Sequence, residues 1–149
     1  GFFSRSGAGY ENVIDFVAFE GVTICRPEGY STGHLEENGL MPPAVNLIQP
    51  ASASKCFEHL MTNSVDLVAM DTRTGERVLE DLNLTYQVAE NPHLFSIQPM
   101  QVALHRNNPA GADIIADLNR GLAVMLETGE WASIVSNGLR DQTNMELVN

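Results

Sequence analysis

The segment TICRPEGYSTGHLEENG, residues 23–39, places a short strand, a glycine-containing connection and the start of a helix in direct succession. Residues 22–25 are rich in β-branched side chains, which predicts a strand. Residues 31–38 predict a short helix that ends before Gly39. The connection is longer and more polar than a plain turn requires. We call residues 26–32 the elbow and expect it to be shaped around a ligand.

Strands and helices continue to alternate after the elbow. The apolar patterns predict strands at 45–49, 65–70 and 84–89, and helices at 53–61 and 73–81. Ser52 is the expected N-cap of the first of these helices, and Asp71 or Thr72 that of the second. Because the connections are short, the alternation predicts an α/β fold in which helices flank a parallel sheet.

The last third of the chain has a different pattern. Residues 99–106 alternate between apolar and polar side chains and predict a strand. A long amphipathic helix is expected at 110–127 and a short one at 130–139, followed by a loosely ordered polar tail, 140–149. The apolar stripe of these helices consists of Ile114, Leu118, Leu122, Met125 and Trp131.

The composition limits the partners of this chain. Its 149 residues suit one domain or one compact piece of a larger protein, and 44% of them are hydrophobic, enough for a core. A formal net charge of −11 argues against nucleic acid and against an anionic membrane surface. No apolar run approaches the roughly 20 residues of a membrane-spanning helix.

The two cysteines, Cys25 and Cys56, are expected to be structural. Cys25 lies in an apolar strand and Cys56 on the apolar stripe of a helix, which argues against a catalytic Cys–His pair. The nearby His34 and His59 lack the spacing of a metal site, so we predict no metal. The residues alone leave two buried thiols as open as a disulfide.

The candidate site follows from the geometry of parallel strands, because ligands bind beyond the carboxyl ends of such strands. The elbow leaves one strand and Asp71 directly follows another, so both are expected at the same edge. Gly29 allows a close backbone approach, and the free amides near Ser31 and Thr32 suit a carboxylate. Asp71 suits an ammonium group. Together they predict a site for an amino acid.

A purely structural interpretation remains open at this point. The elbow residues Gly29, Tyr30 and Ser31 can form an ordinary turn before a helix, and Asp71 can be only the cap of the next helix. Arg26 can be a solvated or salt-bridged side chain.

Three segments resemble the bacterial extracellular solute-binding proteins that serve ABC transporters for polar amino acids: GVTICRPEGYST, NSVDLVAMD and LNRGLAVMLETGEWASIV. The last is the most diagnostic, a helix with Asn and Gly-Leu followed by Gly-Glu and an aromatic residue. The resemblance covers residues 1–139 and implies a type 2 periplasmic-binding-protein fold with two lobes. It further implies that the chain binds a solute, carries no cofactor and is not an enzyme.

The resemblance also implies roles for individual residues. Gly29, Tyr30 and Ser31 match the loop that contacts the ligand, and Asp71 matches the acidic residue that receives its α-amino group. The full expected ligand-binding set is Arg26, Glu28, Gly29, Tyr30, Ser31, Thr32 and Asp71. Tyr30 replaces a small hydroxyl residue, and the residues 26–28 are bulkier than usual. These departures favour a solute related to, or larger than, a standard α-amino acid.

By the same resemblance, this chain is the C-terminal portion of such a protein. Residues 1–98 correspond to the second lobe, and 99–139 to a return strand and helices that complete the first. The rest of the first lobe, with an arginine that clamps a carboxylate, would precede Gly1. The implied partner is the membrane permease of an ABC transporter, and the implied location is periplasmic or otherwise extracytoplasmic.

An extracytoplasmic location favours a bridge between Cys25 and Cys56, because disulfides persist outside the cytoplasm. We therefore expect this pair to be a disulfide. The helices of 99–139 carry a stripe that, by resemblance, packs on the first lobe. Left in water, it would form an interaction surface, so we expect two copies of this chain to cover each other as a homodimer.

Two other functions remain as alternatives. The same fold serves as the ligand-sensing ectodomain of membrane receptors, which a transmembrane segment beyond Asn149 would favour. A dehydratase-like enzyme of small acids is the other. His34 and Glu28 are its only nearby candidates for a general acid or base, and a solvated helix residue is the simpler interpretation of each.

Overall fold

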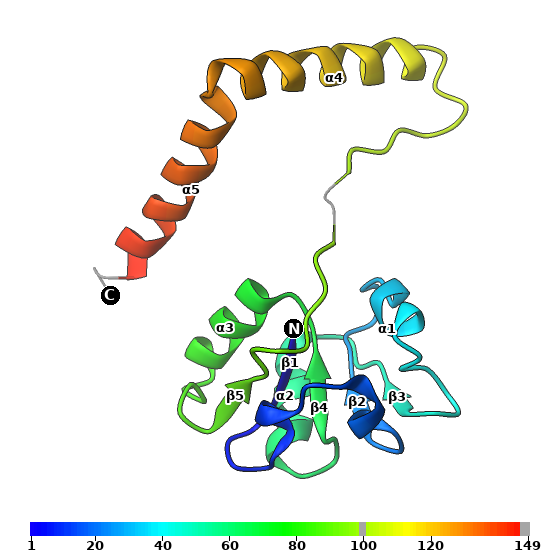
Figure 1. Cartoon of the computed structure of the whole chain (residues 1–149), viewed down its shortest axis with the longest axis vertical. Coiled ribbons are helices and arrows are strands. Elements are labelled where there is room, and N and C mark those ends of the chain that lie inside the picture. Colours follow the sequence, from blue (N-terminus) through cyan, green and yellow to red (C-terminus); the bar gives the residue numbers. More distant parts are fainter. Residues whose placement is uncertain (99–100, 147–149) are drawn as a thin grey trace. The chain divides into compact units, whose positions relative to one another are not determined.

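The computed structural model describes residues 1–98 and 101–146, with side chains as far as residue 138. The chain divides into two compact units, Gly1–Gln98 and Pro99–Asn149 (Figure 1). The first unit is a five-stranded sheet with helices on both faces. The second contains two helices and the connection that leads into them. The assignment of these units to a second and a first lobe stays a prediction.

The elements of the first unit follow the expected alternation after the elbow. Its strands are β1 Phe2–Arg5, β2 Thr23–Cys25, β3 Asn46–Ile48, β4 Leu67–Ala69 and β5 Val88–Glu90. Its helices are η1 Tyr10–Asn12, η2 Phe16–Phe19, α1 Gly33–Glu37, α2 Ala53–Met61 and α3 Thr72–Asp81. Two caps have the expected geometry, because Ser52 Oγ accepts from the Lys55 N–H and Asp71 Oδ1 from the Thr74 N–H.

The sheet is mixed, with the strand order β3-β2-β4-β1-β5. β2 pairs in parallel with β3 and β4, but β1 runs antiparallel to both β4 and β5. The α/β fold with flanking helices is therefore confirmed, and the prediction of a parallel sheet is wrong at β1. The residue pattern of a strand does not specify its direction, which depends on the neighbours between which the strand inserts.

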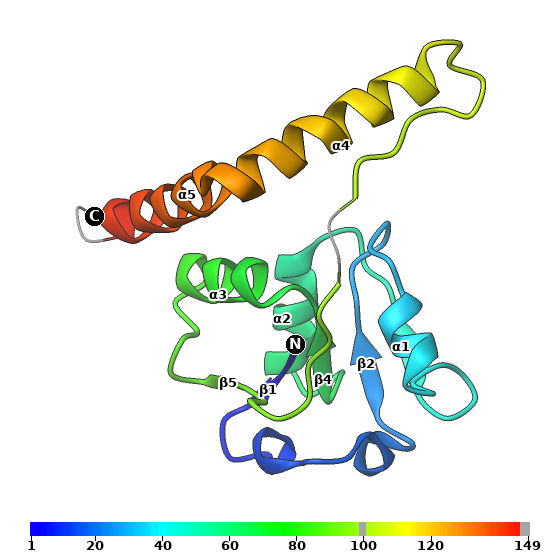
Figure 2. The ribbon, with the colours of Figure 1, turned by 45° about the horizontal axis from the view of Figure 1, so that its top comes forward.

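Two apolar cores lie on opposite faces of the sheet, because successive side chains of a strand point to opposite sides. Phe2, Ile24 and Leu67 pack with η2 and α1 on one face. Phe3 and Val68, which alternate with them, pack with α2 and α3 on the other. Figure 2 shows α1 on one side of β2 and β4, with α2 and α3 on the other.

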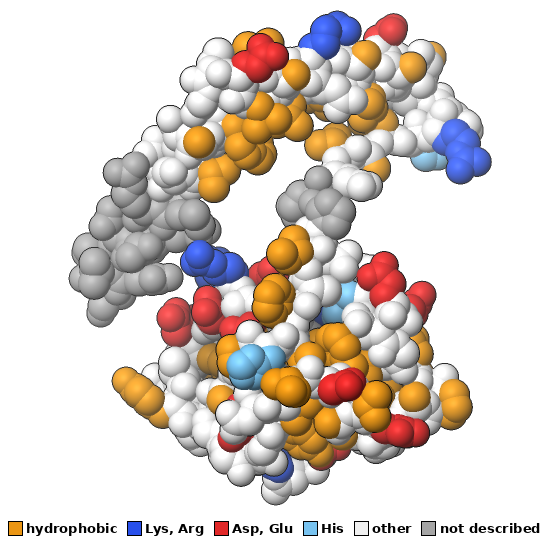
Figure 3. Space-filling model, viewed as in Figure 1, with side chains coloured by type: hydrophobic (Ala, Val, Ile, Leu, Met, Phe, Trp, Pro, Cys, Tyr) orange, Lys and Arg blue, Asp and Glu red, His pale blue; other side chains and the backbone are white. Residues whose placement is uncertain are grey.

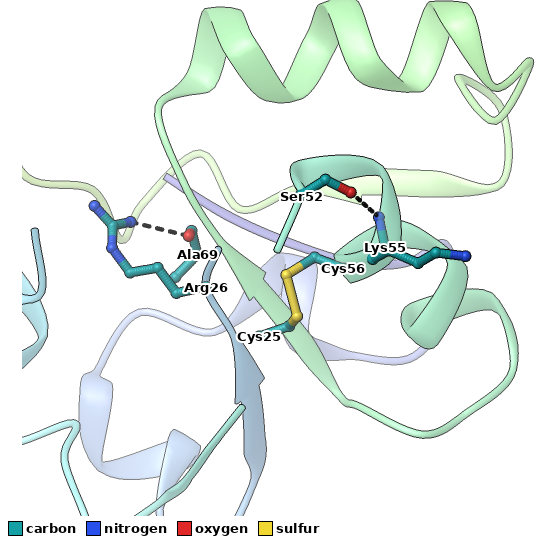
Figure 4. The surroundings of a disulfide bond; sticks show 6 residues. All are labelled: Cys25, Arg26, Ser52, Lys55, Cys56 and Ala69. Carbon is teal, nitrogen blue, oxygen red and sulfur yellow. Dashed lines mark hydrogen bonds between the residues drawn. A yellow bond between two sulfur atoms is a disulfide. The ribbon is translucent and has the colours of Figure 1, made fainter. Parts of the chain in front are cut away.

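A disulfide joins the second core to the end of β2. Cys25 and Cys56 are both fully buried, their Cα atoms are 5.5 Å apart, and their sulfur atoms are bonded (Figure 4). This is the pair that the resemblance led us to expect. The bond fixes α2 against the last residue of β2, immediately before the elbow.

A close approach between α3 and the sheet occurs at Gly75. The residue is buried, and a Cβ atom added to it would lie 2.4 Å from Cζ of Phe3. The absence of a side chain at Gly75 therefore sets the distance between α3 and β1.

The second unit consists of α4 Gly111–Thr128 and α5 Glu130–Glu146. Gly129, with a φ of 75°, separates the two helices. An apolar run follows one side of α4 and is exposed within this structure (Figure 3). The exposed members of the expected stripe are Ile114, Leu118, Leu122 and Trp131. None of the described helices is both long enough and apolar enough to cross a membrane.

Two expectations for this part of the chain are wrong. Residues 101–105 have no regular structure, although a strand was predicted at 99–106, of which 99–100 lie outside the described residues. A strand requires a neighbour that accepts its hydrogen bonds, and no described strand pairs with this segment. The last helix is also longer than predicted, since α5 continues to Glu146.

We predict that replacing both Cys25 and Cys56 by Ser lowers the free energy of unfolding by about 3 kcal/mol, because the unfolded chain loses a cross-link. Urea unfolding of the intact protein measures the difference. The oxidised protein, unfolded without reductant, should contain no free thiol. Two titratable thiols per chain would contradict the bond.

Replacement of Gly75 by Ala should destabilise the protein by about 1 to 3 kcal/mol, because the added methyl group overlaps the Phe3 ring. The matched control is Gly121→Ala in α4, where an added Cβ meets no atom within 4 Å. Gly121→Ala should leave stability unchanged or raise it by up to about 1 kcal/mol. Equal effects of the two substitutions in thermal unfolding would refute the close approach.

Candidate functional site

The carboxyl ends of β2 and β4 lie side by side, and the candidate site is built on this edge. Cys25 is in register with Val68, so the residues that follow each strand leave the sheet next to each other. The Nη1 atom of Arg26 donates to the carbonyl of Ala69 over 2.9 Å, which ties the start of the elbow to the end of β4. The elbow and Asp71 are thus brought to the same edge.

The elbow turns sharply at Gly29. The Tyr30 N–H donates to the Pro27 carbonyl over 3.3 Å, which closes a β-turn with Gly29 at its third position. Gly29 has a φ of 81°, in the left-handed region that such a turn requires. The Glu28 N–H donates to Pro50 over 2.9 Å and holds the turn against the end of β3. Glu28 and Gly29 therefore shape the elbow through their backbone.

The elbow then leads into α1 with backbone donors unused. Thr32 is the N-cap of α1, and its hydroxyl donates to Glu36 Oε1 over 2.8 Å. The Gly33 N–H is satisfied by Ser31 Oγ at 3.3 Å. The N–H groups of Ser31 and Thr32 have no hydrogen-bond partner within the described part of the chain. They are available to a carbonyl or carboxylate oxygen.

Arg26 is buried at the base of the elbow, with 8% of its surface exposed. Its Nε atom donates to the Ser31 carbonyl over 2.6 Å, and its Cζ atom lies 5.7 Å from the centre of the Tyr30 ring. Figure 4 shows the Arg26 side chain turned away from the disulfide. Burial lowers the pKa of Arg26, and Tyr30 acts in the opposite direction.

Asp71 is exposed and has two hydrogen bonds at the start of α3. Its Oδ1 atom accepts from the N–H of Thr74 over 2.9 Å and from the Thr74 hydroxyl over 3.0 Å. The structural role considered for Asp71, that of an N-cap, is therefore present. Its other carboxylate oxygen has no partner in the described part of the chain. An ammonium group of a ligand can bind there without disturbing the cap.

A second carboxylate, Glu90, lies at this edge and was missed in the sequence. Glu90 Oε1 accepts from the Thr72 hydroxyl over 2.6 Å. Burial lowers the pKa of the Gly1 amino group, while the nearby Glu90 and Asp71 oppose that shift. Glu90 ends β5 as Asp71 follows β4, so the rule that identified Asp71 could also have identified Glu90.

His34 lies on α1 behind the elbow and is buried. Burial lowers its pKa from 6.5 to about 4, and the positive charges of Arg26 and the Gly1 amino group add to the effect. The imidazole is therefore neutral at pH 7. No hydrogen bond joins His34 to Glu28 in this structure, so the two candidates for an acid–base pair are not coupled. Across the described residues, no cluster of His, Cys, Asp or Glu is suited to a metal ion.

No protein-family profile matches the sequence, and no curated protein matches it significantly. Solved structures do match. An ancestral arginine-binding protein bound to arginine has a TM-score of 0.62 at 19% identity, over 86% of this chain and 54% of its own. An ancestral arginine-binding protein bound to glutamine has a TM-score of 0.61 at 18% identity, over 86% of this chain and 53% of its own. A mutant of ArgBP from T. maritima has a TM-score of 0.62 at 15% identity, over 87% of this chain and 52% of its own.

These matches establish the fold: the α/β architecture is that of one lobe of a periplasmic binding protein. The chain spans about half the length of the solved structures that it matches, between 52% and 54% of each. The matched structures are binding proteins by their names.

The low pKa of His34 predicts a pH-dependent loss of stability. Unfolded His34 takes up a proton near pH 6.5, whereas the folded residue does so near pH 4, so acid favours unfolding across this interval. The free energy of unfolding should fall by up to about 3 kcal/mol between these two pH values.

The matched variant is His34→Gln, which cannot titrate. Its stability should decline less than that of the wild type over the same pH interval, as measured by urea unfolding. Parallel pH profiles of wild type and variant would show that His34 makes no such contribution.

Proposed function

We propose that this chain binds a small solute, an amino acid or a related compound, on behalf of an ABC-type importer. The observation that carries the proposal is the meeting of opposite donors and acceptors at one sheet edge. Free N–H groups of Ser31 and Thr32 suit a carboxylate, and the free oxygen of Asp71 suits an ammonium group. The two ends of an amino acid are complementary to this pair.

The comparisons support the same proposal at the level of the fold. Structures of this fold include arginine-binding proteins, one of them solved with arginine and one with glutamine. Because this chain spans about half of each, we infer that residues 1–98 supply the second lobe of a two-lobed protein and that the first lobe closes over the solute. Residues 99–139 would belong to that first lobe.

The proposed function requires contact with two further partners. Delivery to an importer requires a membrane permease, and the exposed apolar side of α4 would be covered by the rest of the first lobe. A location outside the cytoplasm agrees with the Cys25–Cys56 disulfide, since such bonds persist in oxidising compartments. Binding of this kind needs no chemical step, so we propose no catalytic residue.

A panel of the twenty protein L-amino acids, each at millimolar concentration, tests the proposal in the intact protein. At least one should raise the unfolding temperature, because a ligand that binds only the folded state stabilises it. Calorimetry then gives its affinity. If no amino acid stabilises the protein, the proposed function fails.

The sharpest test of the site is Asp71→Asn, which keeps an oxygen for the α3 N-cap and removes only the charge. We predict a loss of about 2 to 5 kcal/mol in binding the stabilising amino acid, because its ammonium group loses a charged partner. The control is Asp15→Asn, whose carboxylate also accepts from a backbone N–H at a helix start, on η2. Asp15→Asn should bind normally. Unchanged affinity of Asp71→Asn in calorimetry would remove Asp71 from the site.

A further inference from the structure

Arg26 is a buried cation without an anionic partner. The ion pairs among the described residues are Lys55–Glu58 and Asp117–Arg120, and neither involves it. Its protein partners are two backbone carbonyls, those of Ser31 and Ala69. A guanidinium group has five N–H donors, so three remain without a partner in this structure.

The structural role of Arg26 does not explain its charge. Holding the elbow to β4 needs two neutral hydrogen bonds, which an uncharged side chain can also donate. A buried charge is costly unless an opposite charge compensates it. The cost is visible in the lowered pKa of Arg26, where burial is the largest cause. A negatively charged group bound beside Arg26 would remove this cost of burial.

The position of Arg26 indicates where such a group would bind. The residue follows β2 directly and lies at the carboxyl edge, where the free N–H groups of Ser31 and Thr32 also lie. The Nε bond to Ser31 and the Nη1 bond to Ala69 fix the plane of the guanidinium group. Such a fixed plane suits the two oxygens of a carboxylate.

We propose that Arg26 binds the carboxylate of the solute, so that this unit by itself holds both ends of a small zwitterion: the carboxylate at Arg26 and the ammonium group at Asp71. This rests on the proposed solute-binding function and narrows its ligand class. Neutral sugars lack both charged ends, and polyamines lack the carboxylate. Both are excluded as ligands of this site.

The test pairs a change in the protein with the matching change in the solute. The probes are the protein L-amino acids that bind the intact wild type, each with its α-amide, which keeps the ammonium group and loses the negative charge. The variants are Arg26→Gln, which is neutral, and Arg26→Lys, which keeps the charge without the planar fork. Arg5→Gln is the control, because Arg5 Nη1 also donates to a carbonyl, that of Leu60, over 3.1 Å.

The wild type and Arg5→Gln should prefer the acid to its amide by about 10- to 100-fold in affinity. Arg26→Gln should lose most of this preference, with a remainder from the N–H groups of Ser31 and Thr32, and Arg26→Lys should recover part of it. Thermal unfolding of each variant checks that it is folded. The comparison of acid with amide is made within each variant, so a general loss of affinity does not affect it.

Three results would overturn the inference, and they differ in whether the proposed function also fails. If wild type binds an amino acid and Arg26→Gln keeps the preference for the acid, the carboxylate lies elsewhere and the proposed function stands. If wild type binds an amino acid but binds the acid and its amide equally, the site recognises no carboxylate. If wild type binds no amino acid, the proposed function fails as well.

Discussion

The parallel pairing of β2 with β4 is the interaction on which the rest of the site depends. Its register places Cys25 beside Val68, with Cys25 facing α2 and Arg26 facing the opposite side of the sheet. A slip of one residue would reverse both side chains, because neighbours in a strand point to opposite faces. Cys25 would then point away from Cys56 on α2, and Arg26 would no longer reach the carbonyl of Ala69.

Sequence patterns predicted the elements well where local signals act alone. The strand and helix around the elbow, and the caps at Ser52 and Asp71, depend on residues close together in the chain. The direction of β1 and the strand predicted at 99–106 depend instead on distant partners. β1 inserts between two strands that lie later in the chain, and no described strand pairs with residues 101–105. The alternation of apolar and polar side chains along a strand indicates neither its direction nor whether a partner strand is present.

The candidate site shows the same division. Asp71 and the elbow could be located because the residues that follow parallel strands share an edge. Glu90 obeys that rule as well, because it directly follows the strand predicted at 84–89, although that strand begins only at Val88. The burial of Arg26 and the low pKa of His34 could not be predicted from the neighbouring residues in the sequence. Both arise when the elbow and α1 fold against the sheet.

The residues that we propose to bind the solute also make structural hydrogen bonds, and these bonds would favour binding. Asp71 is held by Thr74, and Arg26 by two carbonyls, so neither would lose much side-chain freedom on binding a solute. The free oxygen of Asp71 favours a positively charged group on the ligand, and the free N–H groups of Arg26 favour a negatively charged one. Occupation by a zwitterion would neutralise the buried guanidinium group, and stability and binding would therefore be linked through the same residue.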